Sequence, residues 1–208
     1  MDFGNYEGLK KPHAFVSADM ILYHKREYTG DLLNDVEILV STRKIEPFQN
    51  YLSLTFGGYI DPTDNSPLHT AIRETKEESG IDLYKNTPRD FTFLGSFGPA
   101  RVHQHIKPYT YNDIRFHTIT EGTEQPGNTR PCVTFAFAFC CRKKMEGYES
   151  DEATSIQWMS VRKIITEYGD KIAFDHARFL HTLIERVRDI SAIHILQQAG
   201  EHINWDEP

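Results

Sequence analysis

The chain has 208 residues, a length that suits one domain of generous size better than two independent ones. Hydrophobic residues make up 39% of the sequence and charged residues 25%, which excludes low-complexity disorder and fibrous classes and indicates a soluble globular chain. The 30 Asp and Glu outnumber the 23 Lys and Arg, and the formal charge of -7 removes the general attraction that drives binding to nucleic acid or to an anionic membrane.

Extended segments come first in the chain. Residues 15–23 and 36–42 are rich in β-branched and aromatic side chains and are joined by a polar stretch, so they are expected to form a hairpin. Residues 51–56 form a third extended candidate, which ends in an expected turn at Gly57-Gly58. Residues 61–67 are dense in turn formers and predict a loop.

A helix is predicted to begin at Ser66 and Pro67, because serine is a favoured N-cap and proline a favoured first helical residue. Apolar or small side chains then recur at helical spacing, at Leu68, Ala71, Ile72 and Thr75. The helix is expected to end at Gly80, since glycine readily adopts the left-handed conformation that closes a helix.

The second half of the chain predicts more strands and one long helix. Residues 91–97, 133–141 and 156–160 alternate or run apolar, which brings the expected sheet to about six strands. Residues 173 to about 195 have helical periodicity and predict a long helix packed on the sheet.

Residues 102–130 fit neither the strand nor the helix pattern. Their polar tail contains Gly and Pro and predicts a long loop, with a β-hairpin around Asn112 and Asp113 as the alternative. Loops of this length inside compact domains are usually functional or mobile.

The sequence also indicates a cellular compartment. The longest apolar runs are far shorter than the roughly 20 residues that a bilayer-spanning helix needs. The first residues do not resemble a secretory signal. The three cysteines, Cys132, Cys140 and Cys141, are expected to be reduced structural thiols rather than a metal or redox site. We therefore expect a cytoplasmic protein that binds neither nucleic acid nor a membrane.

Three carboxylates mark the predicted helix as a candidate site. Glu74, Glu77 and Glu78 are spaced i, i+3 and i+4, so they share one helical face and repel one another. A hard divalent cation such as Mg²⁺ would relieve this repulsion, because it is bound through carboxylate oxygens. Arg73, four residues before Glu77, can hold one carboxylate in place. The alternative is a solvated helix face with salt bridges.

The surrounding residues resemble the Nudix box of the Nudix hydrolases. That pattern is Gly, five residues, Glu, seven residues, then Arg-Glu-apolar-x-Glu-Glu-x-Gly-apolar, and this chain has Gly58 and then Arg73-Glu-Thr-Lys-Glu-Glu-Ser-Gly-Ile. Here the segment from Gly58 to Arg73 is one residue longer, and Asp64 or Asn65 replaces the loop glutamate. The box loop is therefore expected to be reshaped.

Residues outside the box are similar to the branch that contains ADP-ribose pyrophosphatases and Nudix-related regulators of NAD metabolism. They are Ala18-Asp-Met-Ile-Leu, Arg43-Lys-Ile-Glu-Pro-Phe, Glu152-Ala followed by Trp158, and Ala173-Phe-Asp-His-Ala-Arg. The resemblance implies an α/β Nudix fold, a mixed sheet sandwiched between helices, as a single domain over residues 1–208 with its core at about 13–190. A following DNA-binding domain is not expected.

The same resemblance implies Mg²⁺-dependent hydrolysis of a nucleoside diphosphate linked to another moiety, with Mn²⁺ as a substitute metal. Glu77 and Glu78 correspond to metal ligands, Glu74 to a ligand or base, and Arg73 to the residue that orients them. The Gly57 carbonyl is a further candidate ligand. ADP-ribose is the expected substrate. The alternatives are another sugar nucleotide, a dinucleotide, an oxidised nucleotide, or a sensor that binds such a ligand without turnover.

A catalytic base outside the box is common in the family, and Glu152 is the candidate. Its neighbours Glu149 and Asp151 compete for the role, and a solvated acidic turn is the equally weighted alternative.

Substrate contacts are expected from Arg101, which could grip a phosphate or ribose or form only a surface salt bridge. Phe97 and Tyr109, with Tyr111, could stack on a base or simply pack. Asp175 and His176 are expected to make a structural hydrogen bond.

Three histidines of the long loop, His103, His105 and His117, lack the partners of a zinc site and are expected to be loop or substrate-contact residues. Many relatives in this branch are dimers, so a homodimer is an expectation that the resemblance adds.

Overall fold

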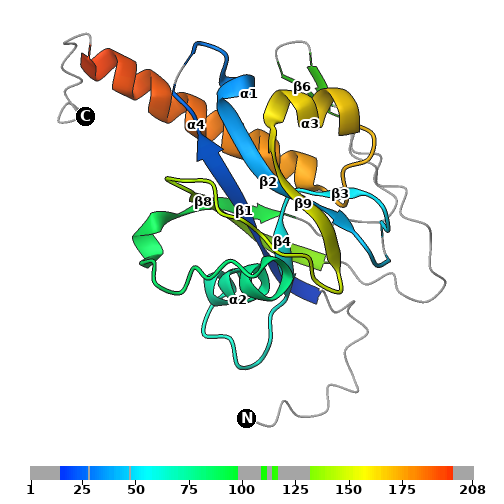
Figure 1. The fold of residues 1–208 in the computed structure, drawn as a ribbon. Coiled ribbons are helices and arrows are strands. Elements are labelled where there is room, and N and C mark those ends of the chain that lie inside the picture. Colours follow the sequence, from blue (N-terminus) through cyan, green and yellow to red (C-terminus); the bar gives the residue numbers. More distant parts are fainter. Residues whose placement is uncertain are drawn as a thin grey trace, which may run out of the picture.

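The chain folds around a mixed β-sheet that forks on one side of its central strand (Figure 1). The computed structural model describes residues 15–27, 29–46, 48–97, 109–111, 114–116 and 132–198. The strands of the main sheet are β1 (Phe15–Lys25), β2 (Val36–Arg43), β3 (Leu52–Ser53), β4 (Phe56–Tyr59), β5 (Phe91–Phe97), β8 (Cys132–Cys140) and β9 (Ala153–Ser160). The α/β class predicted from the sequence is confirmed.

Strand β1 is the centre of this sheet. From Phe15 to Tyr23 it runs parallel to β8, which in turn carries β5 as the antiparallel edge strand. On its other side β1 has two antiparallel neighbours in succession, β4 at Ser17–Met20 and β2 at Tyr23–Lys25. Since β2 then leaves β1 to pair with β3 and β9, the sheet splits into two branches. Residues 54 and 55 cross the fork, because they join β3 on one branch to β4 on the other.

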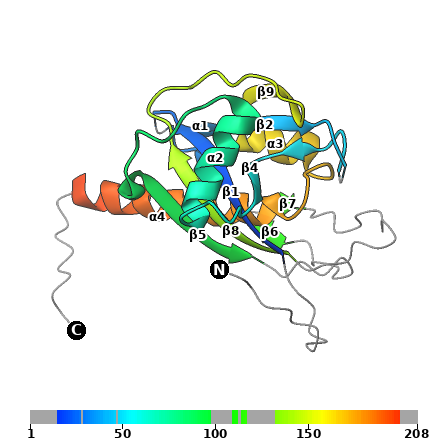
Figure 2. The same cartoon turned by 90° about the horizontal axis from the view of Figure 1, so that it is seen from below.

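Helices cover both faces of the sheet (Figure 2). Alternation along β1 explains the two layers, because successive side chains of a strand point to opposite faces. Ala18, Met20 and Leu22 pack with residues of α2 (Pro67–Ser79). Ile21 and Tyr23 pack in the other cluster, which contains residues of α3 (Val161–Tyr168) and α4 (His176–Gln198). The predicted sandwich of a sheet between helices is confirmed.

Helix α2, called the box helix because it carries Arg73 and the three glutamates of the box, has the ends that the sequence predicts. The Ser66 hydroxyl accepts a hydrogen bond from the His69 backbone N–H at 3.2 Å, and Pro67 occupies the first turn. Gly80 closes the helix with φ at +74°, a left-handed conformation that costs other residues steric strain. Local signals were sufficient here because capping involves only neighbouring residues.

Several predicted elements differ from the structure. Gly57 and Gly58 do not form a turn but lie inside β4, paired with Asp19 and Ala18. The predicted hairpin of the first two strands pairs only at its closed end, and the connection includes the short helix α1 (Leu32–Asp35). Helix α3 was not predicted, and the last helix begins at His176 rather than at residue 173.

The long predicted loop contains described residues at two places. Strands β6 (Tyr109–Tyr111) and β7 (Ile114–Phe116) pair antiparallel, which is the alternative hairpin at Asn112 and Asp113. The remainder of residues 102–130 lies outside the described residues. A short 3-10 helix, η1 (Pro88–Asp90), leads into β5.

No helix within the described ranges combines the length and hydrophobicity needed to cross a bilayer. Cys140 and Cys141 are free thiols, as expected, whereas nothing is described of the Cys132 side chain.

Candidate active site

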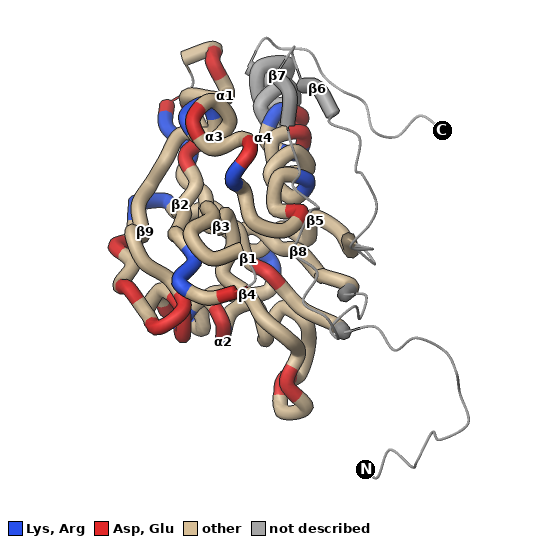
Figure 3. Tube along the Cα trace, turned by 90° about the vertical axis from the view of Figure 1, so that its right-hand side faces the viewer, with Lys and Arg blue, Asp and Glu red and all other residues tan. Residues whose placement is uncertain are grey.

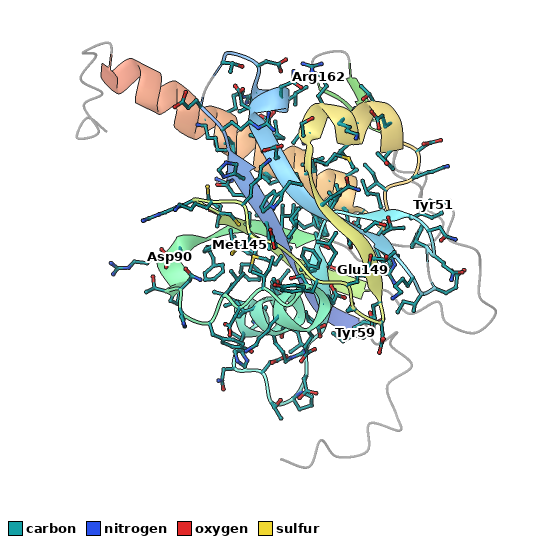
Figure 4. The ribbon with its side chains drawn as sticks, in the orientation of Figure 1. Tyr51, Tyr59, Asp90, Met145, Glu149 and Arg162 are labelled. Carbon is teal, nitrogen blue, oxygen red and sulfur yellow. The ribbon has the colours of Figure 1, made fainter. Side chains whose placement is uncertain are left out.

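A cavity of about 650 Å³ lies at the fork of the sheet. Its walls come from six strands of the sheet, β1, β2, β3, β4, β5 and β8. Helix α2, the segment after β4, the turn before β9 and the start of α4 complete them. In Figure 3 the tube is red at α2 and along the segment before β9, so acidic residues gather at this end of the molecule. Tyr59, labelled in Figure 4, ends β4 at the rim and is 61% exposed.

The two glycines of β4 make room for two carboxylates. A Cβ on Gly57 would lie 2.2 Å from Asp19 Oδ1 and 2.5 Å from the Ala18 carbonyl oxygen. A Cβ on Gly58 would lie 2.6 Å from the carboxyl carbon of Glu74. Because neighbouring strand residues face opposite sides, the pair accommodates Asp19 on the α4 side and Glu74 on the α2 side. Glycine is required here for close approach and not for a turn.

Glu74 and Glu78 line the cavity from α2. Glu78 Oε2 accepts a hydrogen bond from the Gly57 backbone N–H at 3.1 Å. Burial, with the nearby Glu74 carboxylate adding to it, raises the pKa of Glu78 to about 8, despite that hydrogen bond. Burial also raises the pKa of Glu74, although Arg73 opposes the change. Both carboxylates therefore lie where negative charge is poorly compensated.

Arg73 connects the box helix to the box loop. Its Nη1 donates to Glu74 Oε1 at 2.7 Å and to Glu77 Oε2 at 2.9 Å. Its Nε and Nη2 donate to the two carboxylate oxygens of Asp64 at 3.2 and 3.0 Å. A planar guanidinium suits such forked contacts. The orienting arrangement expected of Arg73 is thus present in the geometry.

Asp64, rather than Asn65, takes the place of the missing loop glutamate. Its side chain is buried and also accepts hydrogen bonds from Thr70 Oγ1 at 2.8 Å and the Asp61 backbone N–H at 3.1 Å. The hydrogen bonds from Arg73 hold the pKa of Asp64 well below its usual range. The loop is one residue longer than in the family pattern, with aspartate in place of the loop glutamate, and in this chain the Asp64 carboxylate pairs with Arg73 at 3.0 Å.

Glu77 does not line the cavity with the other two glutamates. Its side chain is 57% exposed and is paired with Arg73. Glu74 and Glu78 are i and i+4 and point in nearly the same direction, whereas Glu77 is rotated away from both on the helix. The metal-ligand roles predicted for Glu74, Glu77, Glu78 and the Gly57 carbonyl stay predictions.

Of the three acidic residues before β9, only Glu152 lines the cavity. Its carboxylate contributes to the raised pKa values of Glu74 and Glu78. Glu149, labelled in Figure 4, instead accepts hydrogen bonds from Thr154 Oγ1 at 2.6 Å and the Ser155 backbone N–H at 2.9 Å. These bonds make Glu149 part of the turn and leave Glu152 as the better-placed candidate base.

The other predicted contact residues divide into two groups. Phe97 lines the cavity and packs against Phe179 with ring centroids 4.5 Å apart. Tyr109 lies in β6, and nothing is described of its side chain or that of Tyr111. Arg101 and the loop histidines His103, His105 and His117 lie outside the described residues.

Two cavity residues, Asp19 and Arg43, were not predicted as site residues, although their segments carried the family resemblance. Burial raises the pKa of Asp19 to about 7, and the carboxylates of Asp175 and Glu74 contribute in the same direction. Arg43 is partly buried, which lowers its pKa, while its positive charge interacts with Glu78, Glu152 and Asp19. The available signal was a charged residue inside or at the end of an otherwise apolar strand, at 15–25 and 36–43.

The donor set of the cavity suits a hard divalent cation. Its carboxylate oxygens are the ligands that Mg²⁺ prefers, and burial and the neighbouring Glu74 carboxylate raise the pKa of Glu78. Among the described residues, no three acidic, His or Cys side chains stand close enough together to hold an ion as they are placed. Binding would therefore have to draw these carboxylates together.

Comparisons with known proteins agree with this architecture. The family model for the NUDIX domain matches residues 26–183. No curated protein matches the sequence significantly.

Solved structures show the same fold at low sequence identity. A MutT/nudix family protein from Enterococcus faecalis has a TM-score of 0.58 at 19% identity, over 88% of this chain and 67% of that one. The NUDIX domain of Shewanella oneidensis NrtR, in complex with ADP ribose, has a TM-score of 0.58 at 15% identity, over 88% and 93%. A bifunctional NMN adenylyltransferase/ADP ribose pyrophosphatase from Francisella tularensis, with AMP and an Mn ion, has a TM-score of 0.54 at 19% identity, over 87% and 44%.

Proposed function

The chain belongs to the Nudix hydrolase family, and on that premise we propose that it cleaves the diphosphate of a nucleoside diphosphate linked to another moiety, in a Mg²⁺-dependent reaction. One observation carries the proposal. The cavity at the fork is lined by Glu74 and Glu78 of the box helix, by Arg73 and by Glu152 from the turn before β9. This is an acidic site of the kind that binds a metal together with substrate phosphates.

The reaction assigns a role to each of these side chains. Glu74, Glu77, Glu78 and the Gly57 carbonyl would hold the metal. The chemistry that Mg²⁺ supplies at such a site is neutralisation of phosphate charge and acidification of a water molecule. Arg73 fixes Glu74 through its hydrogen bond and is itself anchored by Asp64. The water oxygen attacks one phosphorus, the bond from that phosphorus to the bridging oxygen breaks, and two phosphate monoesters leave.

Glu152 is proposed to accept the proton of the attacking water on its carboxylate. The Glu152→Gln substitution keeps the shape of the side chain but cannot take up this proton. We expect kcat to fall by about 10²–10⁴-fold with little change in KM. Steady-state kinetics would measure this, with Glu149→Gln as the matched control that keeps its activity. A fully active Glu152→Gln enzyme would remove Glu152 from the mechanism.

ADP-ribose is the proposed substrate. The Shewanella NrtR domain was crystallised with ADP ribose, and the Francisella enzyme is named as an ADP ribose pyrophosphatase. A cavity of about 650 Å³ is within the usual range for a small-molecule site. The Mn ion in the Francisella complex supports Mn²⁺ as a substitute for Mg²⁺. Other sugar nucleotides, dinucleotides and oxidised nucleotides share the diphosphate chemistry and are the alternatives within this function.

A non-catalytic ligand sensor is the second candidate. Glu77 is bound to Arg73 and turned from the cavity, and no metal-ready cluster of three groups stands among the described residues. A protein that kept this arrangement on binding ligand would not hydrolyse it.

A substrate panel separates these functions. Hydrolysis of ADP-ribose and related nucleoside diphosphate derivatives would be measured with and without Mg²⁺, with Glu78→Gln as the control. Cleavage that needs Mg²⁺ and disappears in the variant supports the enzyme and identifies the substrate. Binding without cleavage supports the sensor.

A further inference from the structure

The cavity extends beyond the box carboxylates to the face of the sheet that α4 covers. This part, which we call the α4 compartment, has walls from β1, β3 and the residues after it, β5, β8, and the start of α4 with the two residues before it. Its hydroxyl groups belong to Ser17, Ser53, Thr55 and Thr134, and its other polar and aromatic side chains to Asp19, Phe97, Phe174, Asp175, His176 and Phe179. None of these residues belongs to the box.

A hydrogen-bond chain of fixed direction runs along one wall. The Leu54 backbone N–H donates to His176 Nδ1 at 3.3 Å, so Nδ1 carries no proton and the neutral ring carries its proton on Nε2. That N–H lies 3.1 Å from Thr55 Oγ1, and the Thr55 hydroxyl in turn donates to Asp19 Oδ1 at 3.0 Å. Burial lowers the pKa of His176 to about 3, which keeps the ring neutral. The chain thus holds the Asp19 carboxylate in place as an acceptor.

Aromatic rings lie next to this chain, because the ring centroids of Phe174 and Phe179 are 5.3 and 5.5 Å from that of His176. Phe97 and Phe179 pack together with ring centroids 4.5 Å apart. Phe174 has φ at +50°, an unusual conformation for a bulky residue, and the Arg43 guanidinium lies 4.9 Å from its ring centroid. Such strain persists where surrounding contacts enforce it and is often found at ligand sites. The rings offer flat apolar surfaces beside the polar wall.

The charges of the compartment disfavour a phosphate. The cations among the described residues that line the cavity are Arg43 and Arg73, and Arg73 is bound to the box carboxylates. Asp19 and Asp175 give the α4 compartment carboxyl oxygens as acceptors, and Asp175 is paired with Arg178 at 3.4 Å. A second phosphate or a carboxylate would meet repulsion there, whereas a hydroxyl would find an acceptor.

We propose that the α4 compartment binds the sugar ring attached to the far phosphate of the substrate, with Asp19 accepting a ring hydroxyl and the phenylalanines contacting the apolar face. The inference rests on the proposed function, because the diphosphate occupies the box side of the cavity. A sugar carries hydroxyls around its ring, and the compartment presents polar groups from several strands and from α4. A nucleobase has polar atoms only along its edge, so it would leave some of these polar groups without a hydrogen-bond partner.

Calorimetric binding to a Glu78→Gln background in Mg²⁺ tests the assignment. The ligands are ADP-ribose, ADP-glucose and, as the probe without the sugar, ADP. Thr55→Val removes the hydroxyl that positions Asp19 while keeping the side-chain shape. We expect its affinity for one or both sugar nucleotides to fall about tenfold and its affinity for ADP to change less than about twofold. Thr166→Val, on the exposed side of α3, is the matched control and leaves all three affinities unchanged.

Ser17→Ala is the second variant, which keeps the test possible if Thr55→Val does not fold. Ser17 Oγ lies 2.8 Å from Thr134 Oγ1 in the wall, and its loss leaves the chain from His176 to Asp19 intact. A selective loss for the sugar nucleotides is again expected. Two results would overturn the inference. In the first, both variants lose as much affinity for ADP as for the sugar nucleotides. In the second, Glu78→Gln without a further substitution binds the sugar nucleotides no more tightly than ADP. Sugar-selective binding without hydrolysis by the wild type would overturn only the proposed function.

Discussion

At the scale of single residues, the site has few positively charged side chains to compensate its carboxylates. Arg73 is shared among three acidic side chains, and Asp64 fixes its position from the box loop. The sequence left the choice between Asp64 and Asn65 open, because both are short polar residues at adjacent positions. The structure decides it through burial and the forked contact with Arg73.

The Asp64→Asn substitution tests this anchor. It keeps the shape of the side chain but removes the charge opposite Arg73, so we expect the free energy of unfolding to fall by about 2 kcal/mol. Turnover should fall as well, because Arg73 then holds Glu74 less firmly. Urea denaturation and steady-state kinetics would measure the two effects. Asn65→Ala is the control at the neighbouring exposed position and should change stability by less than about 0.5 kcal/mol. Equal effects of the two substitutions would contradict the assignment.

At the scale of elements, β4 brings the box into contact with the centre of the sheet. The sequence indicated that Gly57-Gly58 was special but attributed the pair to a turn. The structure shows a paired strand in which each missing side chain leaves room for a carboxylate on one face. The box helix, by contrast, was predicted with its ends, because its caps and periodicity are local.

Alanine at the two glycines is expected to give different defects. In Gly57→Ala the new Cβ meets the Ala18 carbonyl oxygen of β1, which cannot move without separating the strands, so stability should fall by about 3 kcal/mol. In Gly58→Ala the three atoms nearest the new Cβ all belong to the Glu74 carboxylate, a side chain that can turn away. That variant should fold normally and lose activity at least about tenfold. Denaturation and turnover assays on both variants would check this, and a stable, active pair would disprove it.

At the scale of the whole molecule, the fork gathers carboxylates at one end of a protein whose formal net charge is -7. Asp19 lines this cavity from β1 and Glu78 lines it from α2. The pKa of Asp19 is raised to about 7 and that of Glu78 to about 8. The expected homodimer and cytoplasmic location are properties at the same scale and stay predictions.

These pKa values predict how stability depends on pH. The ordinary values are 3.8 for Asp19 and 4.5 for Glu78, so between these and the raised values the folded state binds more protons than the unfolded state. Stability from these groups is therefore present at low pH and lost as the pH rises through about 7 to 8. The melting temperature of the metal-free protein should fall from pH 5 to pH 8 more steeply than that of Glu78→Gln. Mg²⁺ should reduce the difference, and parallel curves without metal would contradict the prediction.

The sequence by itself determined the family resemblance, the box helix and the acidic character of the site. These depend on residues close together in the chain, since helical periodicity and capping act over a few positions. Only the tertiary structure decided that Asp19, Thr55 and His176 share a wall of the cavity, that Glu77 is turned toward Arg73, and that Glu152 rather than Glu149 faces the site. The hydrogen bonds to His176 join residues more than 120 positions apart. Strand pairing and the fork create that proximity, and no local pattern encodes it.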